Sequence, residues 1–223
     1  MFTNREQAGI QLAAALTHYK GRDAVILAVP RGGVPVAYEV AKYLELPMDI
    51  ILTKKIGHPM NKEYAIGAAS MDDYFVITHE DVSQKYITSE VEDIRSKLKA
   101  SYDKFINNRH QETLYNKIVI VVDDGIATGN TLLATVNLLK KSHPLKIIIA
   151  TPVASSSGKI KLASVADEVI SLLVPEEFYG VGAFYEDFEQ VSDTEVICLL
   201  NEIQKRKKVP LPFSDNKKVD RGQ

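Results

Sequence analysis

Short apolar runs alternate with amphipathic stretches along most of the chain. Runs rich in Val, Ile and Leu predict strands that are buried on both faces, at residues 24–29, 48–52, 117–122, 146–153 and 168–174. Helical spacing of apolar residues predicts helices at residues 1–19, 34–44, 131–141 and 156–163. The capping-box sequence Ser192-Asp193-Thr194-Glu195 predicts a last helix toward Gln204.

This alternation indicates the fold class. Parallel strands need crossover connections, and helices between consecutive strands supply them. We therefore expect an α/β fold, with a mainly parallel twisted sheet flanked by helices, over residues 1–204. The remaining residues 205–223 are polar and basic, which is typical of a mobile tail.

The region between residues 52 and 117 departs from this alternation. Residues 57–62 are rich in Gly, Pro and Asn, which predicts a loop. Residues 65–70 and 74–78 have the composition of strands and predict a hairpin. Residues 88–108 are polar but carry apolar residues at helical spacing, which predicts an inserted helix.

Composition and charge narrow the class of protein. Of the 223 residues, 45% are hydrophobic and 25% are charged, which is typical of a soluble globular protein. The formal net charge of -2 gives no general attraction to nucleic acid or to an anionic membrane. The single Cys198 excludes an intrachain disulfide and a cysteine-based zinc site. The sequence shows neither a signal peptide nor a run of roughly 20 apolar residues that could cross a membrane, so we expect a cytoplasmic protein.

The segment after the run at 117–122 carries the most chemical information. It reads Asp123-Asp124-Gly125-Ile126-Ala127-Thr128-Gly129-Asn130-Thr131 and leads into a helix. Ligands bind at this edge of open α/β sheets, and the free N–H groups of a helix start favour a phosphate. Two carboxylates would repel that phosphate, so we expect them to face sugar hydroxyls or a metal ion. A plain strand-to-helix turn explains a single acid and glycine but not the whole set.

Four apolar residues, two acids and Gly-x-Ala-Thr-Gly-x-Thr resemble the signature of type I phosphoribosyltransferases, which bind 5-phosphoribosyl-1-pyrophosphate (PRPP). In that family the acids hold the ribose 2- and 3-hydroxyls, and the following loop holds the 5-phosphate. The resemblance implies magnesium as a cofactor, carried by PRPP and reaching the protein through Asp123 and Asp124. The implied PRPP ligands in this chain are Asp123, Asp124, Gly125, Ala127, Thr128, Gly129, Asn130 and Thr131.

A second segment, Arg31-Gly32-Gly33, follows the first predicted strand and resembles the family's pyrophosphate loop. Arg31 supplies a permanent positive charge, and the glycines allow close backbone approach. Lys54 and Lys55 follow the second predicted strand, where the family commonly places a basic residue that contacts phosphate. The implied catalytic residues are therefore Arg31, Lys54 or Lys55, Asp123 and Asp124.

The same resemblance places a mobile loop or hairpin at residues 57–78, as a small hood or lid that shields the sugar from water. His58 would serve there as a general base or would simply be solvated. The inserted helix at 88–108 would pack over the site, support the lid or form a dimer contact. Its apolar stripe favours a structural role.

Residues 175–190 are predicted to form the acceptor side of the site. Their aromatic residues suit stacking on a planar base, although they would equally suit capping the core. The stretch loosely resembles the hypoxanthine-guanine branch of the family, but Ser171-Leu172-Leu173-Val174 lacks that branch's lysine. The candidate acceptor contacts are Phe178, Tyr179, Val181 and Tyr185.

The implied activity is displacement of pyrophosphate from PRPP by a nitrogenous base or a similar acceptor. The implied partners are PRPP and a small-molecule acceptor, and a homodimer follows by analogy with the family. An alternative is a regulatory protein that senses PRPP or a nucleotide and has no transferase activity. The sequence lacks the catalytic motifs of a phosphatase or of a nucleotide-sugar enzyme. A PRPP-forming enzyme would need an ATP site, which the sequence does not show.

Overall fold

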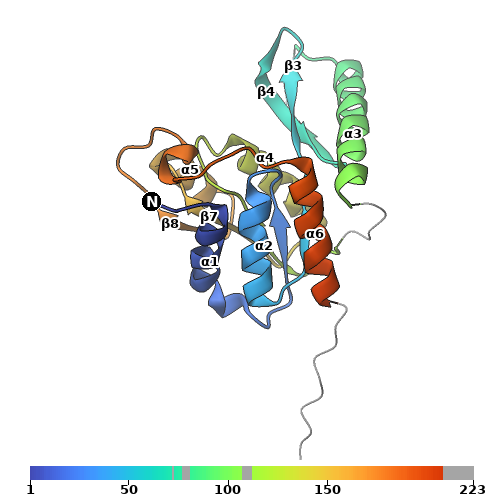
Figure 1. Ribbon diagram of the computed structural model, residues 1–223. Helices are drawn as coiled ribbons and strands as arrows, with labels where there is room; N and C mark the ends of the chain where they lie inside the picture. The colour runs from blue at the N-terminus through green and yellow to red at the C-terminus, as the bar shows by residue number, and fades with distance from the viewer. Residues whose placement is uncertain (72, 77–80, 107–111, 208–223) are drawn as a thin grey trace, which may run out of the picture.

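The computed structural model describes residues 1–71, 73–76, 81–106 and 112–207. Within these residues the main body contains a five-stranded sheet in which every neighbouring pair is parallel. The predicted α/β class is confirmed (Figure 1). The strands, in spatial order, are β2 (Met48–Ile50), β1 (Ala24–Ala28), β6 (Ile118–Val122), β7 (Lys146–Val153) and β8 (Glu168–Leu173).

Helices cover both faces of this sheet, because successive strand residues point to opposite faces and both sets are apolar. On one face, Ile26 and Ile120 pack with α1 (Arg5–Ala15), α2 (Gly33–Leu44) and α6 (Asp193–Lys207). Figure 1 shows α2 between α1 and α6. On the other face, Val119 and Val121 pack with α4 (Asn130–Leu139) and α5 (Ser156–Ala163). Short 3₁₀ helices occupy Thr17–Tyr19, Lys140–Ser142 and Val181–Phe184.

Strand β6 is the centre of the sheet and of the core. Val119, Ile120, Val121 and Val122 are all fully buried, between β1 on one side and β7 on the other. Parallel strands all end at the same edge, so the residues after β1, β6 and β7 meet there. This edge is where open α/β folds bind ligands.

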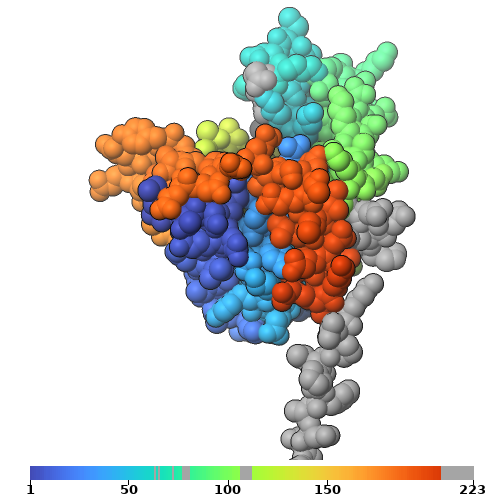
Figure 2. Space-filling model, in the orientation of Figure 1, coloured from blue at the N-terminus to red at the C-terminus, as the bar shows by residue number. Residues whose placement is uncertain are grey.

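A second unit, which we call the hood, stands above that edge (Figures 1 and 2). It consists of an antiparallel three-stranded sheet, β3 (Lys54–His58), β4 (Asn61–Ala69) and β5 (Tyr74–Val76), and of α3 (Gln84–Ile106). The two parts of the hood share an apolar core that includes Ile56, Ile66, Val91, Ile94 and Leu98.

Polar contacts also join the hood sheet to its helix. The Lys62 ammonium lies 2.5 Å from a Glu90 oxygen and donates to the Tyr86 hydroxyl at 2.7 Å. That hydroxyl in turn donates to the Gly57 carbonyl at 2.7 Å. The hood is connected to the main body by ion pairs of Lys141 with Asp73, at 2.6 Å, and of Lys104 with Asp193, and by Phe105 of α3, which is buried in the main-body core.

The prediction of a loop at residues 57–62 is wrong for most of these residues. Residues 57–58 end β3 and residues 61–62 begin β4, so the turn is confined to Pro59 and Met60. The strand pairing is irregular at Gly57, where the register shifts on both sides. A glycine inside a strand often marks such a bulge, and it weakened the strand pattern in the sequence.

The other predictions for this region hold with shifted ends. The hairpin of 65–70 with 74–78 is confirmed by the antiparallel pairing of β4 with β5, and residues 77–78 lie outside the described residues. The inserted helix begins at Gln84 instead of residue 88 and is described to Ile106.

Helix α6 runs to Lys207, past the predicted start of the tail at 205, and residues 208–223 lie outside the described residues. No described helix has both the length and the apolar character that a membrane span requires.

The hood core predicts a mutational effect. Ile66 is fully buried between the hood sheet and α3. We expect Ile66→Ala to lower the free energy of unfolding by about 2–5 kcal/mol, because it leaves a cavity in the hood core. Chemical denaturation measures this loss. Ile160→Ala, at a side chain that is 70% exposed, is the control and should change stability by less than about 0.5 kcal/mol. Equal effects of the two substitutions would contradict the packing described.

Candidate functional site

Two adjacent carboxylates lie at the carboxyl end of the central strand. β6 ends at Val122, and Asp123 and Asp124 follow it out of the sheet. The Asp124 N–H donates to the Asp123 carboxylate at 2.9 Å, and both side chains are only partly exposed. The strand therefore delivers two negative charges to one small volume at the ligand-binding edge.

The segment Arg31-Gly32-Gly33 lies directly against this acid pair, as its position after β1 predicts. A Cβ atom on Gly32 would come within 1.9 Å of the Asp124 Oδ2 atom, so only glycine leaves room for the carboxylate. The peptide bond between Pro30 and Arg31 is cis. Gly33 begins α2, whose N-terminal end therefore faces the same edge.

Arg5, the first residue of α1, is the counter-charge of the acid pair. Its Nε atom donates to the Asp124 Oδ2 atom at 2.9 Å, and the two side chains are 11% and 14% exposed. One terminal nitrogen donates to the Glu189 carbonyl at 2.8 Å, and the guanidinium lies 3.8 Å over the Phe188 ring. The acid pair is thus joined to the N-terminal helix and to the segment before α6.

Burial dominates the electrostatics of the pair. It raises the pKa of Asp123 well above its usual range, and the neighbouring charge of Asp124 raises it further. Burial also raises the pKa of Asp124, while the Arg5 guanidinium acts in the opposite direction. Arg5 therefore reduces, but does not cancel, the cost of keeping two carboxylates together.

The loop 127–131 runs from the acid pair to α4, with Gly129 as the N-cap. The Ser155 hydroxyl donates to the Ala127 carbonyl at 2.5 Å, and the Lys161 ammonium donates to the Thr128 carbonyl at 2.8 Å. Lys161 also donates to the Asn130 side chain at 2.8 Å. Residues of α5 and its N-cap thus hold the loop from behind, while Thr128, Asn130 and Thr131 stay exposed beside the N-terminus of α4.

Arg31 is held away from the acid pair by a different carboxylate. Its Nε atom lies 2.8 Å from one oxygen of Asp193, and Lys104 from the hood helix contacts the other oxygen. Lys104 and Arg31 together hold the pKa of Asp193 below its usual range. The predicted pyrophosphate arginine is therefore half-exposed and already bound to an anionic group.

Lys54 and Lys55 come shortly after β2, where the chain enters the hood. They begin β3 of the hood and pair with Ala69 and Ala68 of β4. Both are exposed. The choice between them as a phosphate contact stays a prediction.

The predicted acceptor segment also reaches the acid pair. Val181 packs on Gly125, where an added Cβ would lie 2.4 Å from a Val181 methyl. The Tyr185 hydroxyl donates to the Asp124 carbonyl at 2.7 Å, and burial raises the pKa of Tyr185. Phe178 stacks on Phe184 with ring centroids 5.6 Å apart. Tyr179 is 81% exposed, so among the four candidates it is the aromatic side chain that solvent reaches most freely.

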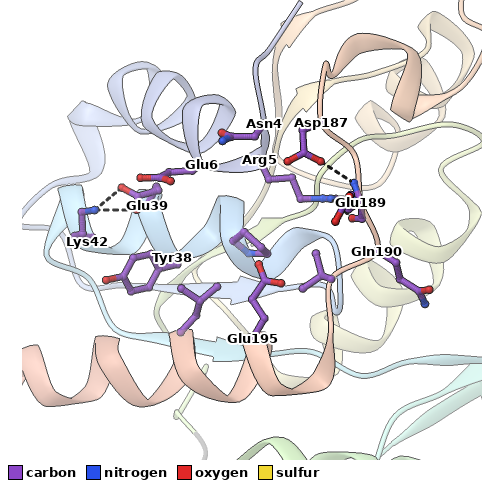
Figure 3. A pocket seen from close by; sticks show the side chains of 13 residues that line it. Asn4, Arg5, Glu6, Tyr38, Glu39, Lys42, Asp187, Glu189, Gln190 and Glu195 are labelled. Carbon is purple, nitrogen blue, oxygen red and sulfur yellow. Dashed lines mark hydrogen bonds and ion pairs between the residues drawn. The ribbon is translucent and has the colours of Figure 1, made fainter.

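A separate cavity of about 490 Å³ lies behind Arg5, between α1, α2, α6 and residues 187–191 (Figure 3). Glu39, which is only 5% exposed, forms an ion pair with Lys42 at its edge. This cavity does not contain the acid pair. Its lining is polar and includes Asn4, Arg5, Glu6, Tyr38, Glu39, Lys42, Asp187, Glu189, Gln190 and Glu195.

The donors available for a metal ion are the two carboxylates of the acid pair. Among the described residues no group of three or more His, Cys, Asp or Glu could hold a metal. Magnesium is usually bound through one or two carboxylates together with substrate phosphates and waters. The acid pair fits a magnesium ion that arrives with a phosphorylated substrate.

Several residues of the site were missed by sequence reasoning. Arg5 is 119 positions from Asp124, and no local pattern joins them. Lys161 and Asp193 act through contacts that only the folded chain creates. Ser155 did carry a signal, because it is the N-cap of α5 and its hydroxyl accepts from the Gly158 N–H at 2.9 Å.

Comparisons with known proteins agree with this arrangement. Residues 3–189 match the family described as the phosphoribosyl transferase domain. A Mycobacterium tuberculosis protein named "putative phosphoribosyl transferase", found in strains CDC 1551 and H37Rv, is 35% identical over 206 residues. The match covers 90% of this chain and 46% of that protein, so the chain spans about half the length of these relatives. The crystal structure of TT1426 from Thermus thermophilus has a TM-score of 0.83 and 35% identity, covering 91% of this chain and 98% of that one.

The raised pKa of Asp123 predicts how stability depends on pH. The folded state keeps a proton on Asp123 that the unfolded chain releases near the ordinary aspartate pKa of about 3.9. The stability that this carboxyl contributes is therefore fully present below that pH and is lost as pH rises through the raised pKa. Each pH unit in this window costs about 1.4 kcal/mol.

We expect Asp123→Asn, which cannot ionise, to be more stable than the parent at pH 7, by a margin that shrinks toward pH 4. Denaturation curves at several pH values measure the margin. Asp23→Asn, at a side chain that is 77% exposed, controls for the loss of one negative charge. A margin for Asp123→Asn that is constant with pH would contradict the raised pKa.

Proposed function

The chain belongs to the phosphoribosyl transferase domain family, and on this basis we propose that it is a magnesium-dependent phosphoribosyltransferase. It would displace pyrophosphate from PRPP with a nitrogenous base or a similar acceptor. The observation that carries the proposal is the meeting of separate segments at residues 123–125. The Arg31-Gly32-Gly33 segment contacts Asp124, the 127–131 loop continues from it, and Val181 packs on Gly125.

The acid pair is the proposed ribose site. Carboxylates accept hydrogen bonds from sugar hydroxyls, and both acids directly follow the buried residues at the end of β6, which fix their position. The same negative charges would favour the positive charge that develops on the sugar when pyrophosphate leaves. In this proposal the protein supplies position and electrostatics, and no covalent nucleophile is needed.

The loop 127–131 is the proposed 5-phosphate site. The N-terminal N–H groups of α4 and the exposed Thr128 and Thr131 hydroxyls supply donors for phosphate oxygens. Ser155 and Lys161 hold the carbonyl groups of this loop from behind. They keep the loop in shape before the ligand arrives, which lowers the cost of binding.

The pyrophosphate would bind at the N-terminal end of α2, beside Gly32 and Gly33. Arg31 would exchange its contact with Asp193 for one with a phosphate oxygen, since a guanidinium binds either anion with the same geometry. Magnesium held by PRPP and the carboxylates of Asp123 and Asp124 would neutralise the charge of the leaving group. The acceptor would enter beside residues 178–181, where Tyr179 is exposed.

Release of pyrophosphate from PRPP with magnesium, measured against purine, pyrimidine and nicotinamide-type acceptors, tests this function. We expect release that depends on one class of acceptor. If PRPP binds measurably but no acceptor in the panel causes pyrophosphate release, a PRPP-sensing protein would be favoured over a transferase. Absence of PRPP binding would overturn the proposal.

The ribose assignment predicts a binding defect for Asp124→Asn. The amide keeps the shape of the side chain but loses a charged acceptor, so PRPP binding should weaken by about 1.5–3 kcal/mol, roughly tenfold to hundredfold. Isothermal titration calorimetry measures the loss. Asp23→Asn is the control and should bind PRPP like the parent, because its side chain is exposed at the opposite edge of the sheet. Unchanged binding by Asp124→Asn would exclude this residue as a ribose ligand.

A further inference from the structure

We propose that Arg5 is a positioning residue of the ribose site, which fixes the Asp124 carboxylate in the orientation that accepts the sugar hydroxyls. The inference rests on the proposed function, because it assumes that the acid pair binds ribose. Arg5 would not contact the substrate itself. It would act through Asp124.

The guanidinium of Arg5 is fixed by contacts with separate parts of the chain. Its Nε atom donates to Asp124, a terminal nitrogen donates to the Glu189 carbonyl, and its Cζ atom lies over the Phe188 ring, 3.8 Å from the ring centroid. Figure 3 shows Arg5 reaching from α1 toward residues 187–189. A planar group with one face on a ring and two edges hydrogen-bonded has little freedom to turn. The direction of its Nε–H bond is therefore set before any ligand binds.

That direction sets the orientation of the Asp124 carboxylate. The Oδ2 atom accepts from Arg5 and lies so close to Gly32 that a Cβ there would be 1.9 Å away. The backbone of the same residue is fixed by the Tyr185 hydroxyl, which donates to the Asp124 carbonyl at 2.7 Å. With the backbone and Oδ2 both engaged, the plane of the carboxylate has a defined direction.

Without Arg5, the Asp124 carboxylate would lose the positive charge that offsets its burial. The carboxylate would then turn away from its present direction or would lose the Nε–H contact that aligns it. Either change removes a well-placed acceptor from the ribose hydroxyls. A lysine at position 5 would keep the positive charge, but it could not reproduce the aligned donors and the stacked plane.

Calorimetric binding of ribose 5-phosphate and of its 2-deoxy and 3-deoxy analogues tests the inference. The ligands differ only in the hydroxyls that the acid pair would hold. We expect the parent to prefer ribose 5-phosphate over at least one deoxy analogue. In Arg5→Gln this preference should largely disappear, because affinity for ribose 5-phosphate falls roughly tenfold to hundredfold while that for the deoxy analogue falls much less.

Companion measurements separate positioning from general support of the fold. Binding of pyrophosphate without magnesium, which would not involve the acid pair, should be the same in the parent and in Arg5→Gln. Arg5→Lys should restore the preference only in part. Arg22→Gln, the same substitution at an exposed arginine, should behave like the parent. Phe188→Leu removes the stacking surface but keeps the charge, and we expect a smaller loss of preference in the same direction.

The outcomes distinguish this inference from the proposed function. A parent that binds ribose 5-phosphate without any preference for its hydroxyls would overturn the ribose site itself. A parent with the preference and an Arg5→Gln protein that retains it would overturn the role of Arg5 alone. Equal weakening of all ligands, pyrophosphate included, would assign Arg5 to the support of the fold. If Arg5→Gln does not fold, an unchanged preference in Phe188→Leu and Arg5→Lys overturns the inference.

Discussion

The close approach of two carboxylates at the end of β6 is the constraint around which the site is built. The buried apolar residues at the end of β6 leave Asp123 and Asp124 no freedom to separate, and their burial makes the negative charge costly. The surroundings compensate in different ways: Arg5 supplies charge, Gly32 supplies space, and Tyr185 fixes the backbone. Each comes from a distant part of the chain, so the acid pair organises the whole edge of the sheet.

Much of this arrangement was predictable because its signals are local. Strands buried on both faces appear as continuous apolar runs, and each of the five predicted runs forms a strand of the parallel sheet. The acid pair, its glycines and the start of α4 are contiguous, so one short segment predicts both the turn and its chemistry. The position of Arg31-Gly32-Gly33 followed from topology alone, because the ends of parallel strands share an edge.

The features that were missed or misjudged depend on contacts over long distances. Arg5 became visible as a partner of Asp124 only when the fold packed α1 against β7 and β8 and brought its first residue to the Asp124 carboxylate. The hood strands at 57–62 contain residues that favour loops, and pairing with neighbouring strands and packing on α3 decided their structure. The sequence placed Lys54 after β2 but did not show that it begins an antiparallel strand of the hood.

The exposed ion pairs that connect the hood to the main body differ in kind from the apolar core inside the hood. Lys141 with Asp73 and Lys104 with Asp193 are formed by partly exposed side chains, so dissolved ions weaken them. The hood core is insensitive to such screening. Dissolved salt should therefore loosen only the polar part of the hood's attachment, because Phe105 of α3 stays anchored in the apolar core of the main body.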